Sequence, residues 1–282
     1  MSGPIPPGKR AARPCARVVG FTFFLWTLAS GAMVTALLAG FGTVVVLLIP
    51  DAAHRIPLIW SRALLLMTGV RVETTFEAPL PDGPVVLASN HQGICDIPAL
   101  FVGLGRDRPF VYVAKKQVFA YPFIGWFLKA AGYVGVDRGN HAAALQNLEK
   151  AGERIREGTS IMVFPEGTRS HDEAILPFKK RAFHVAMRAG VPIVPIALEG
   201  SLQVSPKRRW YVCPNTVHIR AGVAYPLSGM TDGDRERVVA EVRTRVSELH
   251  RQLVGLGGGV GDAVAAPGLA AFAATVRTGE IR

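Results

Sequence analysis

A histidine and an aspartate five residues apart, His91 and Asp96, are the pair in this sequence best suited to acid–base chemistry. On one regular helix they would point about 140° apart, so they meet only if His91 precedes a helix and Asp96 lies in its first turn. Gly93, between them, permits the required turn. A carboxylate that holds one imidazole nitrogen leaves the other free to take a proton from an alcohol. The pair therefore predicts a general base that needs no serine nucleophile when the substrate supplies the hydroxyl.

Other interpretations of this block stay open. His91 and Asp96 also suit a local helix-capping network. Cys95, four residues after His91, would share its face on a helix and would allow a cysteine–histidine acyl-enzyme. A small buried residue is the commoner role of an unpaired cysteine, and Asp96 already completes a simpler mechanism. A metal site is disfavoured because the sequence offers no third ligand at helical spacing.

A second polar block, Glu166-Gly167-Thr168-Arg169, follows the apolar run Ile161–Phe164. Sheets of α/β proteins place ligands at the ends of such strands. Gly167 allows a close backbone approach, Thr168 supplies a hydroxyl, and Arg169 can grip a phosphate through two N–H groups. Glu166 can accept a hydrogen bond from a polyol hydroxyl. The alternative is an ordinary strand-to-loop turn with a solvated arginine.

Weaker signals accompany these two blocks. Gly135–Gly139 places Arg138 after another candidate strand, and Val191–Pro195 is an apolar stretch flanked by two prolines. Basic residues gather at three points, Lys115-Lys116, Lys179-Lys180-Arg181 and Lys207-Arg208-Arg209. Such clusters suit the phosphates of a donor, an acceptor or a lipid, and they equally suit a solubilising surface.

Seven short runs rich in β-branched residues, bounded by Gly, Pro or Asp, predict strands. They are Val72–Phe76, Val85–Ala88, Phe110–Ala114, Tyr133–Val136, Ile161–Phe164, Ile193–Ala197 and Val217–Ala224. Helical stretches lie between several of them, at Asp96–Val102, His141–Glu157, Phe178–Ala189 and Asp232–Leu253. Strands that alternate with helices predict an α/β fold with a mixed, largely parallel central sheet flanked by helices.

The whole chain of 282 residues carries a net charge of +11, with 49% hydrophobic and 19% charged residues. This composition is more apolar than that of an ordinary soluble domain. The positive charge favours nucleic acid, an anionic membrane surface or phosphorylated substrates. The chain lacks an aromatic-and-basic RNA motif and a clear reading helix, so we expect no nucleic-acid partner. Three well-separated cysteines without zinc or redox spacing favour a reducing compartment.

The N-terminal part predicts a membrane anchor. Val18–Pro50 contains no charged residue and is longer than the apolar region of a signal peptide, so we expect it to be retained. Gly31, Gly40 and Gly42 are expected break points, and Ile56–Val70 suits a helix at the membrane interface. Basic residues on both flanks favour a hairpin that dips into one leaflet, with the catalytic domain facing the cytosol. One tilted span is the competing arrangement.

The expected organisation is therefore a basic disordered tail at 1–17, a membrane-anchoring helical region at 18–70, a catalytic domain at 71–254 and a Gly/Ala-rich tail at 255–282. The last tail contains a weak helical signal at Leu269–Val276.

In their order and spacing, four blocks between about residues 85 and 197 resemble the glycerolipid acyltransferase family, most of all the 1-acyl-sn-glycerol-3-phosphate acyltransferases. They are Ser89–Pro98, Gly135–Gly139, Val163–Ser170 and Val191–Pro195, of which the first and third are specific. Lys115-Lys116 matches a lysine-rich strand end of the family. Phe178-Lys179-Lys180-Arg181 departs from it, with Arg181 where glycine is commoner, at a position that bears on the local backbone and on acceptor choice.

The resemblance implies transfer of a fatty acyl chain from acyl-CoA or acyl-carrier protein to the free hydroxyl of lysophosphatidic acid, giving phosphatidic acid in phospholipid biosynthesis. His91 would be the general base and Asp96 its orienting partner. The expected substrate-binding residues are Arg138, Glu166, Gly167, Thr168, Arg169, Lys115 and Lys179. The proline-containing strand would help to shape the acyl site, and no metal or redox cofactor is expected.

Two alternatives remain. One is acylation of a different lyso-lipid, such as a lysophospholipid with a head group or a lyso-aminolipid. The other is a catalytically inactive membrane- or lipid-binding module, against which the intact His91 and Asp96 argue.

Overall fold

The computed structural model describes residues 17–106, 108–136, 141–170, 174–205 and 212–254. Its seven strands are β1 (Arg71–Phe76), β2 (Val86–Ser89), β3 (Phe110–Lys115), β4 (Val134–Val136), β5 (Ser160–Val163), β6 (Ile193–Glu199) and β7 (Thr216–Ala221). Its α-helices are α1 (Arg17–Leu48), α2 (Arg55–Thr68), α3 (Asp96–Leu104), α4 (Ile124–Ala130), α5 (His141–Arg156), α6 (Arg181–Ala189), α7 (Ser201–Val204) and α8 (Arg235–Leu253). Short 3₁₀ turns lie at Pro50–His54 (η1), Lys116–Ala120 (η2) and Asp232–Asp234 (η3).

The strands form one sheet in the order β1-β7-β6-β2-β5-β3-β4, and every neighbouring pair is parallel except β6–β7. β2 lies at the centre, between β5 and β6. Because parallel strands end at the same edge of a sheet, the loops that follow β2 and β5 emerge side by side. The sheet thereby brings together the two polar blocks of the sequence.

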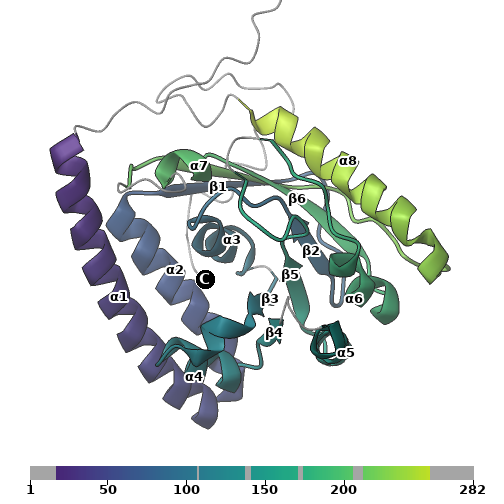
Figure 1. The fold of residues 1–282 in the computed structure, drawn as a ribbon, viewed down its shortest axis with the longest axis horizontal. Helices are drawn as coiled ribbons and strands as arrows, with labels where there is room; N and C mark the ends of the chain where they lie inside the picture. The colour runs from purple at the N-terminus through teal and green to yellow at the C-terminus, as the bar shows by residue number, and fades with distance from the viewer. Residues whose placement is uncertain (1–16, 107, 137–140, 171–173, 206–211, 255–282) are drawn as a thin grey trace, which may run out of the picture.

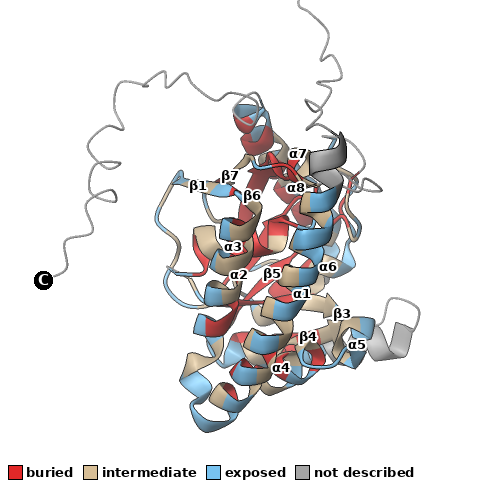
Figure 2. Cartoon of the chain, turned by 90° about the vertical axis from the view of Figure 1, so that its left-hand side faces the viewer, coloured by how far each residue is buried: buried red, intermediate tan, exposed pale blue. Residues whose placement is uncertain are grey.

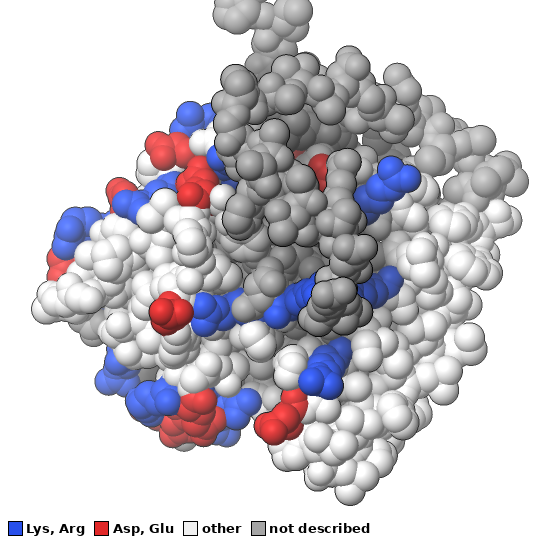
Figure 3. Space-filling model, turned by 180° about the vertical axis from the view of Figure 1, so that it is seen from behind, with Lys and Arg blue, Asp and Glu red and all other residues white. Residues whose placement is uncertain are grey.

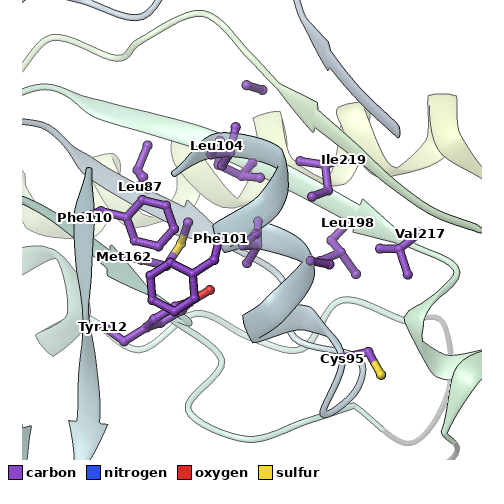
Figure 4. Packing of buried hydrophobic residues seen from close by; sticks show 14 of the residues in the cluster. Leu87, Cys95, Phe101, Leu104, Phe110, Tyr112, Met162, Leu198, Val217 and Ile219 are labelled. Atoms are coloured by element: carbon purple, nitrogen blue, oxygen red, sulfur yellow. The ribbon is translucent and has the colours of Figure 1, made fainter. Parts of the chain in front are cut away.

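The core has two parts, one on each face of the sheet, because side chains alternate along each strand. Leu87 faces the side covered by α2 and α3, where Phe101, Phe110 and Tyr112 form a tight aromatic group (Figure 4). Val86, next along the strand, faces the opposite side, which α5, α6 and α8 cover (Figure 1). The predicted α/β fold with a mostly parallel sheet and flanking helices is confirmed.

The helices α1, α2 and α4 form a further layer, which contacts α3 and the 3₁₀ turn η2 that follows β3. α1 runs beside α2 along the edge of the molecule, and α4 packs near its C-terminal end (Figure 1). Trp60 of α2 donates from Nε1 to the Thr35 hydroxyl of α1 over 2.9 Å. The α1 face turned away from these contacts is apolar and exposed (Figure 2).

The expected breaks in the N-terminal apolar region are wrong. α1 is one unbroken helix of 32 residues that includes Gly31, Gly40 and Gly42. Gly42 serves close packing instead, since a Cβ there would lie 2.7 Å from Ile56 Cγ2 on α2. The chain reverses after α1, at η1, so the helical hairpin consists of α1 and α2 rather than two halves of Val18–Pro50.

All seven predicted strands and all four predicted helices of the catalytic region are present, with small shifts at their ends. The helix expected at Ile56–Val70 is α2, and Arg62 is exposed on it. Sequence patterning missed α4 and α7, which have seven and four residues and are too short to show a helical period. The predictions for the tails at 1–16 and 255–282 lie outside the described residues.

Candidate active site

The loop between β2 and α3, residues 90–95, wraps around the carboxylate of Asp96, the first residue of α3. Its Oδ2 accepts from His91 Nδ1 at 2.6 Å, from Gln92 N at 2.7 Å and from Gly93 N at 2.9 Å. The Asp96 side chain is fully buried. Three donors converging on one buried oxygen suit an ionised carboxylate, which therefore accepts from the imidazole rather than donating to it.

His91 takes its orientation from this contact. Since Asp96 accepts at Nδ1, Nδ1 carries a proton and Nε2 is the basic nitrogen of the neutral ring. The ring also stacks on Phe164, with centroids 4.0 Å apart and planes 13° apart. Phe164 in turn stacks on Tyr112, so a column of aromatic rings limits rotation of the imidazole. The side chain of His91 keeps 17% of its surface exposed.

The loop after β5 holds the backbone of the histidine loop. Glu166 Oε1 accepts from His91 N at 2.9 Å and Oε2 accepts from Leu176 N at 3.3 Å, while Ser170 N donates to the His91 carbonyl at 2.8 Å. Glu166 is 2% exposed, and burial raises the pKa of its carboxyl to about 7 against the opposing effect of these two N–H donors. The geometry gives both oxygens of Glu166 a contact with backbone N–H groups, one of them that of His91, and the polyol contact expected from sequence stays a prediction.

Asn90, just before His91, ties the same loop to β6. Its Nδ2 donates to the Leu198 carbonyl at 2.9 Å and its Oδ1 accepts from Leu198 N at 2.8 Å, a pairing that continues the β2–β6 ladder by one residue. Gly93 packs against the next segment, because a Cβ there would lie 2.5 Å from Ser201 Oγ. The loop is therefore fixed from both neighbouring strands.

His91 lines a cavity of about 880 Å³. One part of its wall is apolar and comes from α1, α2, α3, β3 and α4, represented by Leu38, Trp60, Phe101 and Phe127. This volume lies within the range of small-molecule binding sites, which combine apolar walls with a few polar groups. The proline-containing strand β6 contributes none of the described lining residues, which differs from the expectation that it shapes an acyl site.

The other part of the wall is cationic. Lys115 at the end of β3 lines the cavity, and so do Lys179, Lys180 and Arg181 at the start of α6. Lys179 crosses Gly167 so closely that a Cβ on this glycine, at φ +70°, would lie 2.8 Å from Lys179 Nζ. Lys180 also pairs with Glu236 of α8. The cavity thus joins a basic imidazole, an apolar wall and a positive rim.

His91 and three of the residues predicted to bind substrate, Lys115, Gly167 and Lys179, line this one cavity. Thr168 is exposed and Arg169 half-buried, and neither is among the described lining residues. Arg138 lies outside the described residues. Among the residues described, no cluster of three or more His, Cys, Asp or Glu side chains is arranged to hold a metal ion.

Cys95 lies directly before α3 and is buried at the end of the apolar cluster (Figure 4). Burial, together with the negative Asp96 next to it, raises the pKa of the Cys95 thiol to about 12. A thiol with such a pKa is not ionised at neutral pH and is a poor nucleophile. The geometry therefore favours the acid–base interpretation of the block over an acyl-enzyme on Cys95.

Sequence reasoning missed several residues that act around His91, namely Phe164, Gln92, Glu199 and His250. Phe164 lies within a recognised block, but an apolar residue at a strand end carries no signal of stacking. Glu199 and His250 are far from His91 in sequence, and their proximity depends on the packing of α8 on β6.

The chain resembles known acyltransferases throughout this region. A family model described as Acyltransferase matches residues 71–199. A 1-acyl-sn-glycerol-3-phosphate acyltransferase of Chlamydomonas reinhardtii is 41% identical over 128 residues, which are 45% of this chain but only 38% of that protein. The 1-acyl-sn-glycerol-3-phosphate acyltransferase alpha of Mus musculus is 32% identical over 214 residues, 73% of this chain and 74% of the relative.

The fold has a solved counterpart in the crystal structure of the 1-acyl-sn-glycerophosphate acyltransferase of Thermotoga maritima. That structure matches with a TM-score of 0.71 over 84% of this chain and 97% of its own, at 23% identity. The likeness at this identity concerns the fold. Family membership follows from the sequence relatives: this chain belongs to the acyltransferase family that includes the 1-acyl-sn-glycerol-3-phosphate acyltransferases.

Proposed function

We propose that this protein transfers a fatty acyl chain from acyl-CoA or acyl-carrier protein to the free hydroxyl of lysophosphatidic acid, yielding phosphatidic acid and a free thiol. The observation that carries the proposal is the His91–Asp96 hydrogen bond of 2.6 Å, at the wall of a cavity that is apolar on one side and cationic on the other. The names of the relatives support the same acceptor.

In the proposed reaction, His91 Nε2 takes the proton of the acceptor hydroxyl as its oxygen attacks the thioester carbonyl. Asp96 stabilises the imidazolium through Nδ1, and the face of Phe164 adds a favourable contact with that cation. When the tetrahedral intermediate collapses, the carbon–sulfur bond breaks and the thiolate takes the proton from Nε2. The side chains and the two substrates account for every proton, so the proposal invokes no metal or redox cofactor.

The phosphate of the acceptor is proposed to lie at the rim formed by Lys115 and Lys179, with Arg181 adjoining. This places the glycerol hydroxyl between the phosphate site and His91. Arg138, Thr168 and Arg169 remain proposed contributors from the family resemblance. The acyl chain is proposed to occupy the apolar part of the cavity, where burial stabilises each methylene by about 0.8 kcal/mol.

We also propose that the protein lies on the cytosolic face of a membrane. α1 contains one stretch, Thr22–Leu48, long and apolar enough to cross a bilayer by length and composition. However, α1 packs along α2 and α4, which expose Arg62 and Lys129. A crossing would carry these charges into hydrocarbon at a cost of a few kcal/mol each. An α1–α2 hairpin lying in one leaflet leaves them near the interface.

The surface supports this orientation. In Figure 3, the right-hand side of the molecule, where α1 lies, is largely uncharged. Exposed aromatic side chains Tyr121, Phe123 and Trp126 lie near the C-terminal end of α1. Tyrosine and tryptophan prefer the membrane interface, so they fit the boundary of the embedded part.

The test is an acceptor panel with purified protein and radiolabelled acyl-CoA, repeated with acyl-carrier protein as donor. Lysophosphatidic acid is the expected acceptor, against a lysophospholipid with a head group and a lyso-aminolipid. His91→Ala is expected to abolish transfer, and Asp96→Asn to lower kcat by roughly 10³- to 10⁴-fold. Cys95→Ser is expected to keep most activity. Full activity in folded His91→Ala protein, or preference for another acceptor, would contradict the proposal.

A further inference from the structure

A second buried histidine–carboxylate pair adjoins the His91–Asp96 loop, and the proposed reaction does not use it. His250 of α8 and Glu199 at the end of β6 are 5% and 3% exposed, and His250 Nε2 lies 2.7 Å from Glu199 Oε2. Burial alone would raise the pKa of the Glu199 carboxyl, but hydrogen bonds from His250 and Gln92 outweigh it and lower that pKa. Glu199 is therefore the charged acceptor, and His250 Nε2 carries the donated proton.

Gln92 completes this group. Its Nε2 donates to Glu199 Oε2 over 2.7 Å. The same Nε2 lies 3.2 Å from His250 Nε2, and because both nitrogens donate toward Glu199, this contact is proximity rather than a hydrogen bond. Turning the amide over would bring Gln92 Oε1 against the carboxylate. The Glu199–His250 pair therefore holds the Gln92 amide in one orientation.

Gln92 connects the buried pair to the reacting groups. It follows His91 directly, and its backbone N–H is one of the donors to Asp96 Oδ2. Gln92, Glu199 and His250 are not among the described residues that line the cavity, so they are placed to act on the loop and not on the substrate.

Stability alone is a weak reason for such a group. A buried ion pair costs desolvation, and replacing both members with apolar residues is often neutral or stabilising. Helix α8 already packs on β6 through apolar contacts, because Leu249 and Leu253, on either side of His250, cluster with Ala197 of β6. What Glu199 and His250 add to this apolar packing is a directional hydrogen bond to Gln92 of the loop.

We propose that Glu199 and His250 are positioning residues, which act through Gln92 to hold the His91–Asp96 loop in the geometry that keeps Nδ1 on Asp96. Helix α8, which lies beyond the residues 71–199 matched by the family model, thus supports the site from the far side of the sheet. The kinetic part of its test rests on the proposed function, whereas the spectroscopic part depends only on the hydrogen bond between His91 and Asp96.

The kinetic test compares His250→Leu, His250→Gln and Gln92→Met. His250→Leu is expected to lower kcat by about 10- to 100-fold, with KM for both substrates changed by less than about two-fold, because small misplacements act on the chemical step. His250→Gln, which retains an N–H donor, is expected to recover much of kcat. In the Gln92→Met background, His250→Leu is expected to have little further effect on kcat, since the coupling runs through Gln92.

The control is Val242→Ala, a fully buried α8 position two turns before His250 that loosens the helix without touching Gln92. It is expected to lower the melting temperature and leave kcat unchanged. If His250→Leu proves too unstable, the double variant Glu199→Gln/His250→Leu takes the place of that single variant, because it leaves no unpaired buried charge. Additive kcat effects of His250→Leu and Gln92→Met, or an equal kcat loss in Val242→Ala, would overturn the proposal.

The spectroscopic test needs no turnover. The Nδ1 proton of His91, held at a 2.6 Å contact, is expected to give a downfield ¹H NMR resonance that His91→Ala removes. His250→Leu and Gln92→Met are expected to shift or broaden it, whereas Val242→Ala preserves it. An unchanged resonance in both variants would refute the positioning role even in a protein inactive on lysophosphatidic acid. If the protein is inactive on lysophosphatidic acid but the two variants change the resonance, the positioning role is supported and only the proposed acceptor is rejected.

Discussion

At the scale of single residues, His91 is restrained in its ring plane, its tautomer and its backbone. Asp96 sets the tautomer, Phe164 limits the ring plane, and Glu166 and Ser170 hold the backbone N–H and carbonyl. In the proposed reaction, a base held in this way loses little freedom when it takes a proton, and such pre-organisation lowers the barrier.

Glu166 allows a test of its buried contact through pH. Its carboxyl titrates near 7 in the folded protein and at its ordinary value of 4.5 in the unfolded chain. Between these values the folded state binds the proton more tightly, so the stabilisation is fully present below pH 4.5 and is lost as pH rises through 7. The free energy of unfolding of the wild type is expected to fall by at most about 3 kcal/mol from pH 5 to pH 8. The melting temperature is expected to fall with it.

Glu166→Gln removes this titration and leaves one acceptor for two N–H donors. We expect the variant to be less stable at low pH, with a flatter pH dependence, measured as thermal unfolding in detergent. A wild-type pH dependence that persists unchanged in Glu166→Gln would assign the titration to another group.

The cationic rim gives a second residue-scale prediction. Lys179→Met is expected to raise KM for lysophosphatidic acid by about ten-fold, the cost of one lost charged hydrogen bond, with kcat changed less. Lys116→Met is the matched control, because Lys116 is exposed and is not among the described lining residues. Arg169→Ala is expected to raise the same KM, with a smaller effect on acyl-CoA. An unchanged KM for a variant would remove its residue from the acceptor site.

At the scale of elements, the parallel arrangement of β5, β2 and β6 gathers the polar loops at one edge. The histidine loop receives a contact from each neighbouring segment: Glu166 after β5, Leu198 within β6, and Ser201 at the start of α7. These contacts add to those that Asp96, the first residue of α3, makes with the loop.

Gly93→Ala tests this clamp. The added methyl group would lie 2.5 Å from Ser201 Oγ and 2.9 Å from the Ser201 carbonyl oxygen, so either the loop or Ser201 must shift. We expect a shift of the loop to weaken the hydrogen bond from Gly93 N to Asp96. We expect kcat to fall by about 100-fold in a folded protein.

The control for that change is Gly152→Ala on α5. No atom lies within 4 Å of its added methyl group, and alanine favours a helix by about 1 kcal/mol over glycine. This variant is expected to be more stable and equally active. Wild-type kcat in Gly93→Ala would show that the loop tolerates displacement.

At the scale of the whole molecule, the same helical layer forms the cavity wall and the exposed apolar face. Ala39 of α1 and Ile56 of α2 line the cavity, while Phe41 and Leu48 of α1 are exposed. In the proposed orientation, this layer of helices alone separates the leaflet from the candidate site. This arrangement links the proposed membrane attachment to substrate access.

The orientation of this layer can be measured by cysteine labelling at positions 5 and 230, in protein that lacks the native cysteines. Both positions are expected to label from the cytosolic side, as a hairpin requires. Phe41→Asp/Leu48→Asp is expected to weaken binding to anionic vesicles, whereas Gly152→Ala leaves it unchanged. Labelling of the two positions from opposite sides of the membrane would establish a crossing helix instead.

The sequence by itself determined most of the elements and placed the two residues of the proposed acid–base pair, His91 and Asp96, next to each other. Short β-branched runs bounded by Gly, Pro or Asp, and helical stretches between them, are local signals. They placed the strands within a few residues and set His91 and Asp96 at a strand-to-helix turn. The same local reasoning was wrong about α1, because glycines that favour a break in isolation are tolerated where they permit close helix packing.

Only the tertiary structure decided how these residues are supported. Glu166 lies 75 residues from His91, and His250 lies 158 residues from Gln92. No local pattern encodes such pairs, since each depends on strand order and on the packing of α8 against β6. For the same reason, the sequence alone does not distinguish an acidic residue that faces a cavity from one that accepts from a neighbouring backbone N–H. Only the tertiary structure shows that Glu166 is buried and accepts from His91 N.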